Sequence, residues 1–502
     1  MGRTLHMKTS YGAVAFSLFI GILCRIGFAR TMPEQMNPLA ISGDRQLFVD
    51  SHLIETLHNV RQQLHTPESR GPVFAFDRPW EGRYCAYVTI LHHGDQFQMY
   101  YRGLTVDALD GSENEVTCYA QSSDGIHWNK PDLGLYEVNG TKQNNVLLAH
   151  HAPYSHNFSP LIDSRPGVPA QERYKAIAGV SNKTGLSAFV SGDGVRWKPW
   201  GPQPVFNDSI EANHVFDSQN VAFWSDSEQC FVLYYRVYKD NIRSIARATS
   251  RDFLNWTPEG MMQFSNDAPT VQEQLYTNQT SPYFRAPQVY ISLAARFMEG
   301  RSVFTPSATR PGDASSAWLG DNCSDVVLMS SRVRNIFDRT FPQALVRPGP
   351  DPRNWASRGN YAALGIIPTG PTEMSLFVQR EYGLPNHYLE RLALRLDGFA
   401  SISAPHEGGE LLTRPLTFSG KSLEINFATS AAGGIRVEIQ DLDGKPIRGY
   451  ALSDCHEIIG DEIARTVHWS GGADVSALAG KPLRLRFWVK EADLYSFRFF
   501  PG

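Results

Sequence analysis

Four carboxylates stand at or just before segments that the sequence predicts to be strands, and their type suits acid–base chemistry. They are Asp50 in RQLFVDSHLIE, Glu81 in FDRPWEGRY, Asp217 in FDSQNVAFWSD and Glu273 in QEQLYTNQT. A pair of carboxyl groups can cleave a glycosidic bond, because one protonates the leaving oxygen while the other acts as base or nucleophile. Such chemistry requires a fold that brings two of them to within about 5–10 Å of each other.

Asp217 is the strongest candidate, because it immediately precedes a predicted apolar strand and follows His214, a potential binding residue, by three positions. Glu81 lies in a Pro/Gly loop directly after Trp80. That aromatic neighbour could raise the pKa of the acid and stack on a sugar ring. The alternative for both carboxylates is structural, at the start of a strand or in a solvated loop.

Asp50 and Glu273 complete the set of candidate catalytic residues. Asp50 ends a short apolar stretch, where it could act as base or nucleophile, or hold a turn instead. Glu273 precedes another predicted strand and has Tyr283 and Arg285 downstream as potential partners for a substrate. The loop around Glu273 could equally be structural.

Two further polar residues, His156 and Asn157 in SHNFSPLID, begin another predicted strand. They could bind sugar hydroxyl groups or hold a water-ligated cation. The chain has no spacing typical of metal ligands, and its cysteines after Cys24 are scattered without a CxxC pair. We therefore predict polar substrate-binding residues, buried thiols, and neither a metal nor another cofactor.

A repeated turn indicates which elements position these residues. The related stretches are SSDGIHWNKP at 122–131, SGDGVRWKPW at 191–200, SRDFLNWTPE at 250–259, SSRVRNIFDR at 330–339 and RLDGFAS at 395–401. Three strand-like segments precede each turn and one follows it, which predicts a five-bladed β-propeller over residues 40–405. One catalytic pair cannot use a residue present in every repeat. We therefore expect Asp124, Asp193 and Asp252 to bond backbone N–H groups and hold hairpins.

The two ends of the chain differ from the repeat. Residues 410–502 carry short alternating strands such as SLEINFATS, which predict a C-terminal β-sandwich and an all-β fold class. Residues 1–30 combine basic residues with the apolar run GAVAFSLFIGILC. This pattern is typical of a signal peptide and predicts a secreted or periplasmic protein, with an uncleaved anchor as the alternative.

A secreted five-bladed propeller followed by a β-sandwich resembles glycoside hydrolase family 32, the invertase and levanase class, and its relative family 43, the arabinanase and xylosidase class. The best local match is FDSQNVAFWSD, which is similar to the family's Arg-Asp-Pro strand. Only Asp217 carries over, and the resemblance implies that it steadies the transition state. The family's Asn-Asp-Pro-Asn and Glu-Cys-Pro motifs, which supply nucleophile and acid, are not found. LFVDSHLIE, DRPWEG and SPLID resemble uncharacterised secreted bacterial glycosidases more closely.

Charge and composition narrow the possible partners. The net charge is −4 without a Lys/Arg run, which disfavours nucleic acid and, once the signal peptide is removed, membranes. The sequence therefore predicts a secreted glycoside hydrolase acting on a poly- or oligosaccharide. The alternatives are a non-catalytic carbohydrate-binding propeller and a propeller for protein contact. The Asp turns are also similar to those of sialidases, but nothing in the sequence marks the arginine triad that sialidases need.

Overall fold

The computed structural model describes residues 37–106, 111–181, 183–208, 210, 214–265, 273–304 and 320–501. The chain divides into two compact units, Met1–Asn37 and Pro38–Gly502, and the second is described below. The predicted signal peptide at 1–30 lies outside the described residues. The named elements are strands and three short 3-10 helices, η1 (Ala170–Glu172), η2 (Pro352–Asn354) and η3 (Ser476–Leu478), which confirms the all-β class. In the described part of the chain, no helix has the length and apolar character needed to cross a membrane.

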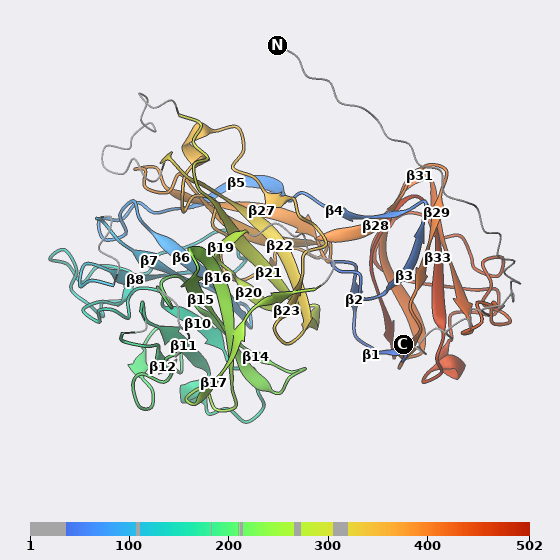
Figure 1. Cartoon of the computed structure of the whole chain (residues 1–502), viewed down its shortest axis with the longest axis horizontal. Helices are drawn as coiled ribbons and strands as arrows, with labels where there is room; N and C mark the ends of the chain where they lie inside the picture. The colour runs from blue at the N-terminus through green and yellow to red at the C-terminus, as the bar shows by residue number, and fades with distance from the viewer. Residues whose placement is uncertain are drawn as a thin grey trace, which may run out of the picture. The chain divides into compact units, whose positions relative to one another are not determined.

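Four sheets of the described residues contain four antiparallel strands each (Figure 1). The first is β6 (Ala86–His93), β7 (Gln96–Gly103), β8 (Val116–Ser122) and β9 (Val146–Leu148). The second is β10 (Ser159–Ile162), β11 (Tyr174–Ala178), β12 (Ser187–Ser191) and β13 (Lys198–Pro199). The third is β14 (Val221–Ser225), β15 (Cys230–Lys239), β16 (Ile242–Ser250) and β17 (Trp256–Met261). Another is β25 (Ile367–Pro368), β26 (Glu373–Arg380), β27 (Tyr388–Arg395) and β5 (Glu68–Ala75).

A larger sheet lies between the third and the last of these in the sequence. Its order is β18 (Gln263–Phe264), β23 (Ile336–Asp338), β22 (Cys323–Val333), β21 (Ala286–Met298) and β19 (Gln274–Thr277). Two short strands join it at the side, β20 (Thr280–Tyr283) against β21 and β24 (Ala344–Val346) against β22. With this sheet, the repeat has five sheets within the described residues.

Strands β6, β10, β14 and β20 of consecutive sheets lie side by side, and the segment just before β25 closes the circuit. β6 contacts β10, β10 contacts β14, and β14 contacts β20. Gln279, beside β20, donates a hydrogen bond to the carbonyl of Ala362 (3.0 Å), and a parallel bridge joins Thr89 of β6 to Leu364. The arrangement is therefore propeller-like, with the first strands at its centre. The N-terminal strand β5 is the outer strand of the last sheet, so this sheet unites the two ends of the repeat.

The repeated turns follow the third strands of three sheets, β8, β12 and β16. The Oδ1 atom of Asp124 accepts hydrogen bonds from the backbone N–H groups of Ile126 and His127, both at 2.8 Å. Asp193 and Asp252 accept the equivalent bonds at their own turns. A serine two residues earlier donates to the same carboxylate in each turn. The predicted hairpin role of these carboxylates is confirmed.

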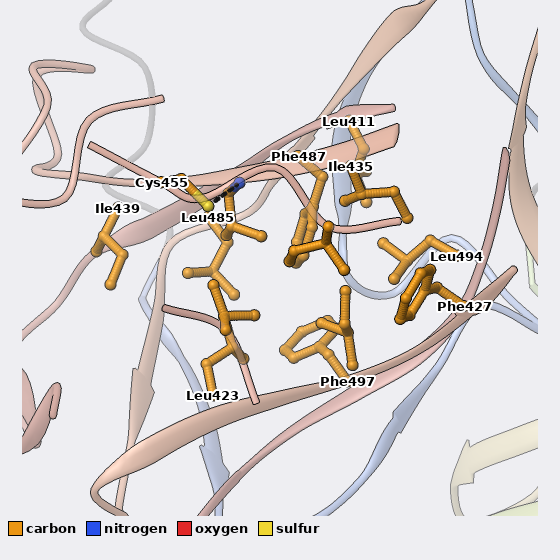
Figure 2. Packing of buried hydrophobic residues seen from close by; sticks show 14 of the residues in the cluster. Leu411, Leu423, Phe427, Ile435, Ile439, Cys455, Leu485, Phe487, Leu494 and Phe497 are labelled. Carbon is orange, nitrogen blue, oxygen red and sulfur yellow. Dashed lines mark hydrogen bonds between the residues drawn. The ribbon is translucent and has the colours of Figure 1, made fainter. Parts of the chain in front are cut away.

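The C-terminal strands form a separate sheet with its own hydrophobic core. The order is β3 (Ile54–His58), β29 (Gly409–Thr413), β33 (Arg484–Phe500), β28 (Ala400–Ala404) and β4 (Arg61–Leu64). β2 (Gln46–Leu47) and β31 (Ser422–Gln440) pair with β33, and β32 (Asp461–Thr466) pairs with β31. β1 (Leu39–Ser42) pairs in parallel with β30 (Leu416–Phe418). Figure 2 shows Phe427, Phe487 and Phe497 packed among aliphatic side chains of this core, all fully buried.

The N-terminal strands belong to this C-terminal sheet. β2 pairs with β33, β3 with β29, and β4 with β28. Residues 46–64 lie inside the range 40–405 that the sequence analysis gave to the repeat, yet the first strand that joins a repeat sheet is β5. Local composition does not encode this pairing, because it depends on hydrogen bonds between segments hundreds of residues apart.

The cysteines of the described residues are free thiols. Cys85, Cys118, Cys323 and Cys455 are buried, as predicted, whereas Cys230 is half-buried. Burial raises the pKa of Cys323 to about 12, so that thiol stays protonated at neutral pH.

Candidate functional site

Charged and aromatic side chains gather where the first strands of the five sheets begin, and every sheet contributes at least one. We call this group the central cluster. Its members are Tyr84, Tyr87, Arg102, Glu115, His156, His214, Asp217, Arg236, Arg243, Tyr276, Arg358, Tyr361 and Tyr382.

A left-handed backbone conformation recurs at this point in all five sheets. Positive φ angles occur at Tyr87 (55°), Asn157 (55°), Phe216 (70°), Gln279 (43°) and Asn360 (64°), each at or shortly before a first strand. Residues other than glycine seldom adopt this conformation, which costs on the order of 1–3 kcal/mol. Because this conformation recurs in all five sheets, we infer that the chain turns sharply at each of these positions and that the neighbouring side chains point to the centre.

Asp217 is the accessible carboxylate of the central cluster. Its side chain is 30% exposed, whereas the side chain of Glu115 is completely buried. The Oδ2 atom of Asp217 lies 3.6 Å from Nη1 of Arg236 and 3.6 Å from Nδ1 of His214. Arg236 also donates a hydrogen bond to the backbone carbonyl of Asp217. The guanidinium group therefore fixes the turn that carries the carboxylate.

A buried ion network forms a second part of the cluster. The Oε1 atom of Glu115 lies 2.8 Å from Nδ1 of His156 and 3.5 Å from Nη1 of Arg102. The guanidinium of Arg102 stacks over the ring of Tyr87 at 4.8 Å and donates to the hydroxyl of Tyr382 at 3.3 Å. The network links side chains from three sheets, which makes it a frame for the site.

Tyr276 lies against two guanidinium groups. The Cζ atoms of Arg236 and Arg243 are 4.7 and 5.0 Å from the centre of its ring. Burial alone would raise the pKa of Tyr276, but the charges of Arg358 and Arg236 outweigh burial, so its pKa lies below the usual value of 10. The ring of Tyr361 is 5.5 Å away, and burial raises its pKa well above 10. The cluster thus contains two neighbouring phenols whose pKa values are shifted in opposite directions.

Trp80 and Glu81 lie in a different place, in a polar core beside the sheet of β6–β9. Glu81 is fully buried and accepts hydrogen bonds from Nζ of Lys130 (2.8 Å) and the hydroxyl of Tyr101 (2.5 Å). The indole N–H of Trp80 donates to Oδ1 of Asn145 (2.8 Å). These bonds anchor the Pro/Gly loop to its sheet.

Asp50 and Glu273 also have partners outside the central cluster. Asp50 is fully buried and bonds Nε of Arg332 at 2.6 Å, which ties the N-terminal segment to β22. Glu273 forms ion pairs with Arg296 (2.9 Å) and Arg339. Burial would raise the pKa of Glu273, but the hydrogen bonds from Arg339 and Arg296 outweigh it and lower the pKa. Of the four carboxylates proposed from sequence, the structure brings Asp217 alone to the cluster.

Some of the proposed substrate-binding residues lie at the central cluster and others lie elsewhere. His156 and His214 are members of the cluster, and Asn157 occupies one of the five positive-φ positions. Tyr283 and Arg285 lie at the other end of β20, where both contact the fully buried carboxylate of Asp397, at 2.9 and 3.3 Å. The Asp397 side chain also accepts a hydrogen bond from Ser496 of β33 (2.6 Å). This group joins the repeat to the C-terminal sheet.

No protein-family model matches the sequence, and no curated protein matches it. The structure is similar, at low sequence identity, to those of five-bladed propeller glycoside hydrolases of families 32 and 43. A family 32 β-fructofuranosidase of Bombyx mori is 11% identical, with a TM-score of 0.41 over 86% of this chain and 95% of that one. A family 43 arabinoxylan arabinofuranohydrolase of Bacillus subtilis, solved with cellotetraose, is 11% identical, with a TM-score of 0.37 over 85% and 98%. An N-acetylgalactosamine deacetylase from F. plautii, solved with blood group B trisaccharide, is 13% identical, with a TM-score of 0.41 over 70% and 97%.

Sequence reasoning missed the arginine and tyrosine members of the cluster, although a signal for two of them is present. The triplet Tyr-Tyr-Arg ends the apolar part of both DQFQMYYRG and CFVLYYRVY, at Arg102 and Arg236. A charged residue inside an apolar strand must be paired when it is buried, so a repeated one points to a shared polar centre. Tyr276 and Tyr361 carry no comparable signal, because aromatic residues are ordinary strand residues.

Proposed function

We propose that the protein is a secreted glycoside hydrolase whose reaction takes place at the central cluster. In this proposal the five sheets are the blades of a five-bladed propeller, and the C-terminal strands form a β-sandwich. The observation that carries it is the placement of Asp217, a 30% exposed carboxylate surrounded by buried arginine and tyrosine side chains. Arginine and tyrosine groups bind sugar hydroxyls, and aromatic faces stack on sugar rings.

Asp217 acts as the general acid in the first step. It gives a proton to the leaving glycosidic oxygen as the bond to the anomeric carbon breaks. A second group must attack or stabilise that carbon. Tyr276 fits this role, because Arg236 contacts both Asp217 (3.6 Å) and the Tyr276 ring (4.7 Å) and therefore sets their relative position.

The Tyr276 step balances as two displacements. The Tyr276 hydroxyl passes its proton to the Asp217 carboxylate, its oxygen bonds to the anomeric carbon, and the leaving oxygen departs with the proton from Asp217. Water then attacks the anomeric carbon, its proton passes to the Asp217 carboxylate, and the phenolate is released. The lowered pKa of Tyr276 supports this assignment, because it makes the phenolate more available.

The decisive experiment measures sugar release by the purified protein and its Asp217→Asn variant. Suitable probes are tetrasaccharides of β-1,4-xylan, α-1,5-arabinan, β-2,1-fructan and β-1,3-galactan. We expect release from at least one probe and a loss of roughly 100-fold or more in kcat for the variant, the usual effect of removing a general acid. Asp226→Asn is the matched control, because Asp226 is exposed at the far end of β14 and bonds Trp224. Undiminished kcat in Asp217→Asn contradicts the assignment.

A non-catalytic carbohydrate-binding propeller is the second candidate. It is favoured by one observation: among the described residues of the cluster, the other carboxylate, Glu115, is completely buried and paired with Arg102 and His156. Binding of one of the four tetrasaccharides without sugar release by the wild-type protein would establish this alternative.

A further inference from the structure

A cavity of about 550 Å³ lies where β19, β21 and β22 meet, beside the central cluster. Its walls include Gln274, Phe297, Ser324 and Trp355. The indole N–H of Trp355 donates to the backbone carbonyl of Gly349 (3.0 Å), which fixes the ring in the wall. A half-buried, fixed indole is a suitable surface for stacking a sugar ring.

The carboxylates of the cavity wall are paired with arginines. Arg296 bonds both Glu273 (2.9 Å) and Asp325 (2.6 Å), and Arg339 also pairs with Glu273. Glu299 lies 3.5 Å from Arg243. Because these carboxylates already have cationic partners, the wall favours an uncharged ligand that offers hydroxyl groups over a basic one.

One polar atom in the wall has no partner among the described residues. The Oγ atom of Ser324 is buried without a hydrogen bond, and Ser324 is only 1% exposed. Buried hydroxyl groups are normally satisfied, because an unmade hydrogen bond costs about 1–3 kcal/mol. Because Ser324 lines the cavity, a ligand hydroxyl group would satisfy this atom once the side chain turns toward the cavity.

Arg243 connects the cavity to the central cluster. Its Nη1 atom donates to Oε1 of Gln274 in the cavity wall (2.5 Å), and its guanidinium lies over the rings of Phe297 (4.3 Å) and Tyr276 (5.0 Å). The rings of Phe297 and Tyr276 are themselves 5.8 Å apart. A ligand in the cavity and a ligand at Tyr276 would therefore be near neighbours.

We infer that the cavity is a second sugar-binding site for an uncharged unit of the same saccharide that occupies the central cluster, with Trp355 as the stacking surface. The inference rests on the proposed function only in that the central cluster binds a saccharide. The ligand expected for the two sites together is a neutral oligosaccharide that is longer than a disaccharide.

The test is calorimetric binding to the Asp217→Asn protein, in which turnover does not consume the ligand. The probes are the disaccharide and tetrasaccharide of each of the four glycans named above. We expect at least one tetrasaccharide to bind roughly tenfold more tightly than its disaccharide. Adding Trp355→Ala should abolish that preference and leave the Kd of the disaccharide within about twofold, and Trp355→Phe should retain most of the preference.

Two further measurements make the result decisive. Trp488→Ala, at a half-buried indole of β33, is the matched control and should leave both Kd values unchanged. Circular dichroism identifies a misfolded Trp355→Ala protein, in which case Trp355→Leu, which removes the aromatic face, and Ser324→Ala carry the test through a weaker tetrasaccharide preference. Equal affinity for both members of every pair, or an unchanged preference in folded Trp355→Ala or Trp355→Leu and in Ser324→Ala, overturns the inference. The proposed function fails separately, through the absence of sugar release by the wild-type protein.

Discussion

The carboxylate of Asp217 lies 3.6 Å from the guanidinium of Arg236, yet the two side chains differ tenfold in exposure, at 30% and 3%. The buried cation thus depends on Asp217 for neutralisation, while the carboxylate remains open to a substrate. Because Arg236 also stacks on Tyr276, one buried guanidinium positions an acid and a phenol from neighbouring sheets.

The first prediction concerns the ionisation of Tyr276. In an absorbance titration at alkaline pH, we expect Tyr276 to ionise before the tyrosines whose pKa values burial raises, because the charges of Arg358 and Arg236 overcome the effect of burial on its own pKa. Tyr276→Phe should remove this earliest step. Arg236→Met should move the step to higher pH, since it removes one of the three cations that lower the pKa of Tyr276. An unchanged step in Tyr276→Phe would show that another residue causes it.

Tyr276→Phe should also reduce kcat by roughly 100-fold or more, because the hydroxyl group is lost while the ring and its packing remain. Tyr100→Phe is the matched control. Tyr100 lies outside the central cluster and its hydroxyl is buried without a hydrogen bond among the described residues, so its removal should change kcat by less than about threefold. The comparison is made on the glycan that the wild-type protein hydrolyses. Equal kcat values for the two variants would rule out a chemical role for Tyr276.

The sequence could predict the strand repeat and the place where a site would form, because the turn around Asp124 recurs with a regular spacing. It could also single out Asp217, which directly precedes a strand. It could not rank Asp50 and Glu81 correctly by local context. Both are held by cations distant in sequence, Arg332 and Lys130, and such pairs form only through long-range packing.

The fifth repeated turn illustrates the same limit. RLDGFAS matches the other turns in sequence, but its aspartate, Asp397, has a φ of 65° and bonds Tyr283 and Ser496 instead of holding its own hairpin. A local sequence pattern identifies a turn, whereas the hydrogen-bond partners of its aspartate depend on which part of the chain packs against the turn. At Asp397, that part is the C-terminal sheet.

Asp397→Ala should therefore destabilise the protein strongly. The substitution leaves Arg45 and Arg285 without their shared carboxylate at a buried position, and breaking such a pair costs about 3–5 kcal/mol. Asp461→Ala is the control, because the Asp461 side chain is 66% exposed in its pair with Arg395. An exposed pair contributes about 0–1 kcal/mol. Urea denaturation measures the free energy of unfolding of each variant. Similar values for Asp397→Ala and Asp461→Ala would contradict the role of Asp397.

Glu273 should make stability depend on pH in the acid range. Its pKa in the folded protein is below the unfolded value of 4.5, because hydrogen bonds from Arg339 and Arg296 outweigh burial. The ionised carboxylate therefore stabilises the fold fully above pH 4.5, and this contribution is lost as the pH falls through the folded pKa. Glu273→Gln should lower the free energy of unfolding by about 1–3 kcal/mol at pH 7, and the difference from wild type should shrink below pH 4.5.

The matched control for this last prediction is Glu299→Gln. Glu299 lines the same cavity, but its side chain is 63% exposed and lies 3.5 Å from Arg243. A substitution at such a surface position should change the free energy of unfolding by less than about 0.5 kcal/mol at every pH. Denaturation of the three proteins between pH 3 and 7 provides the measurement. A Glu273→Gln difference that stays constant across this range would show that the Arg296 and Arg339 pairs do not hold the carboxylate ionised.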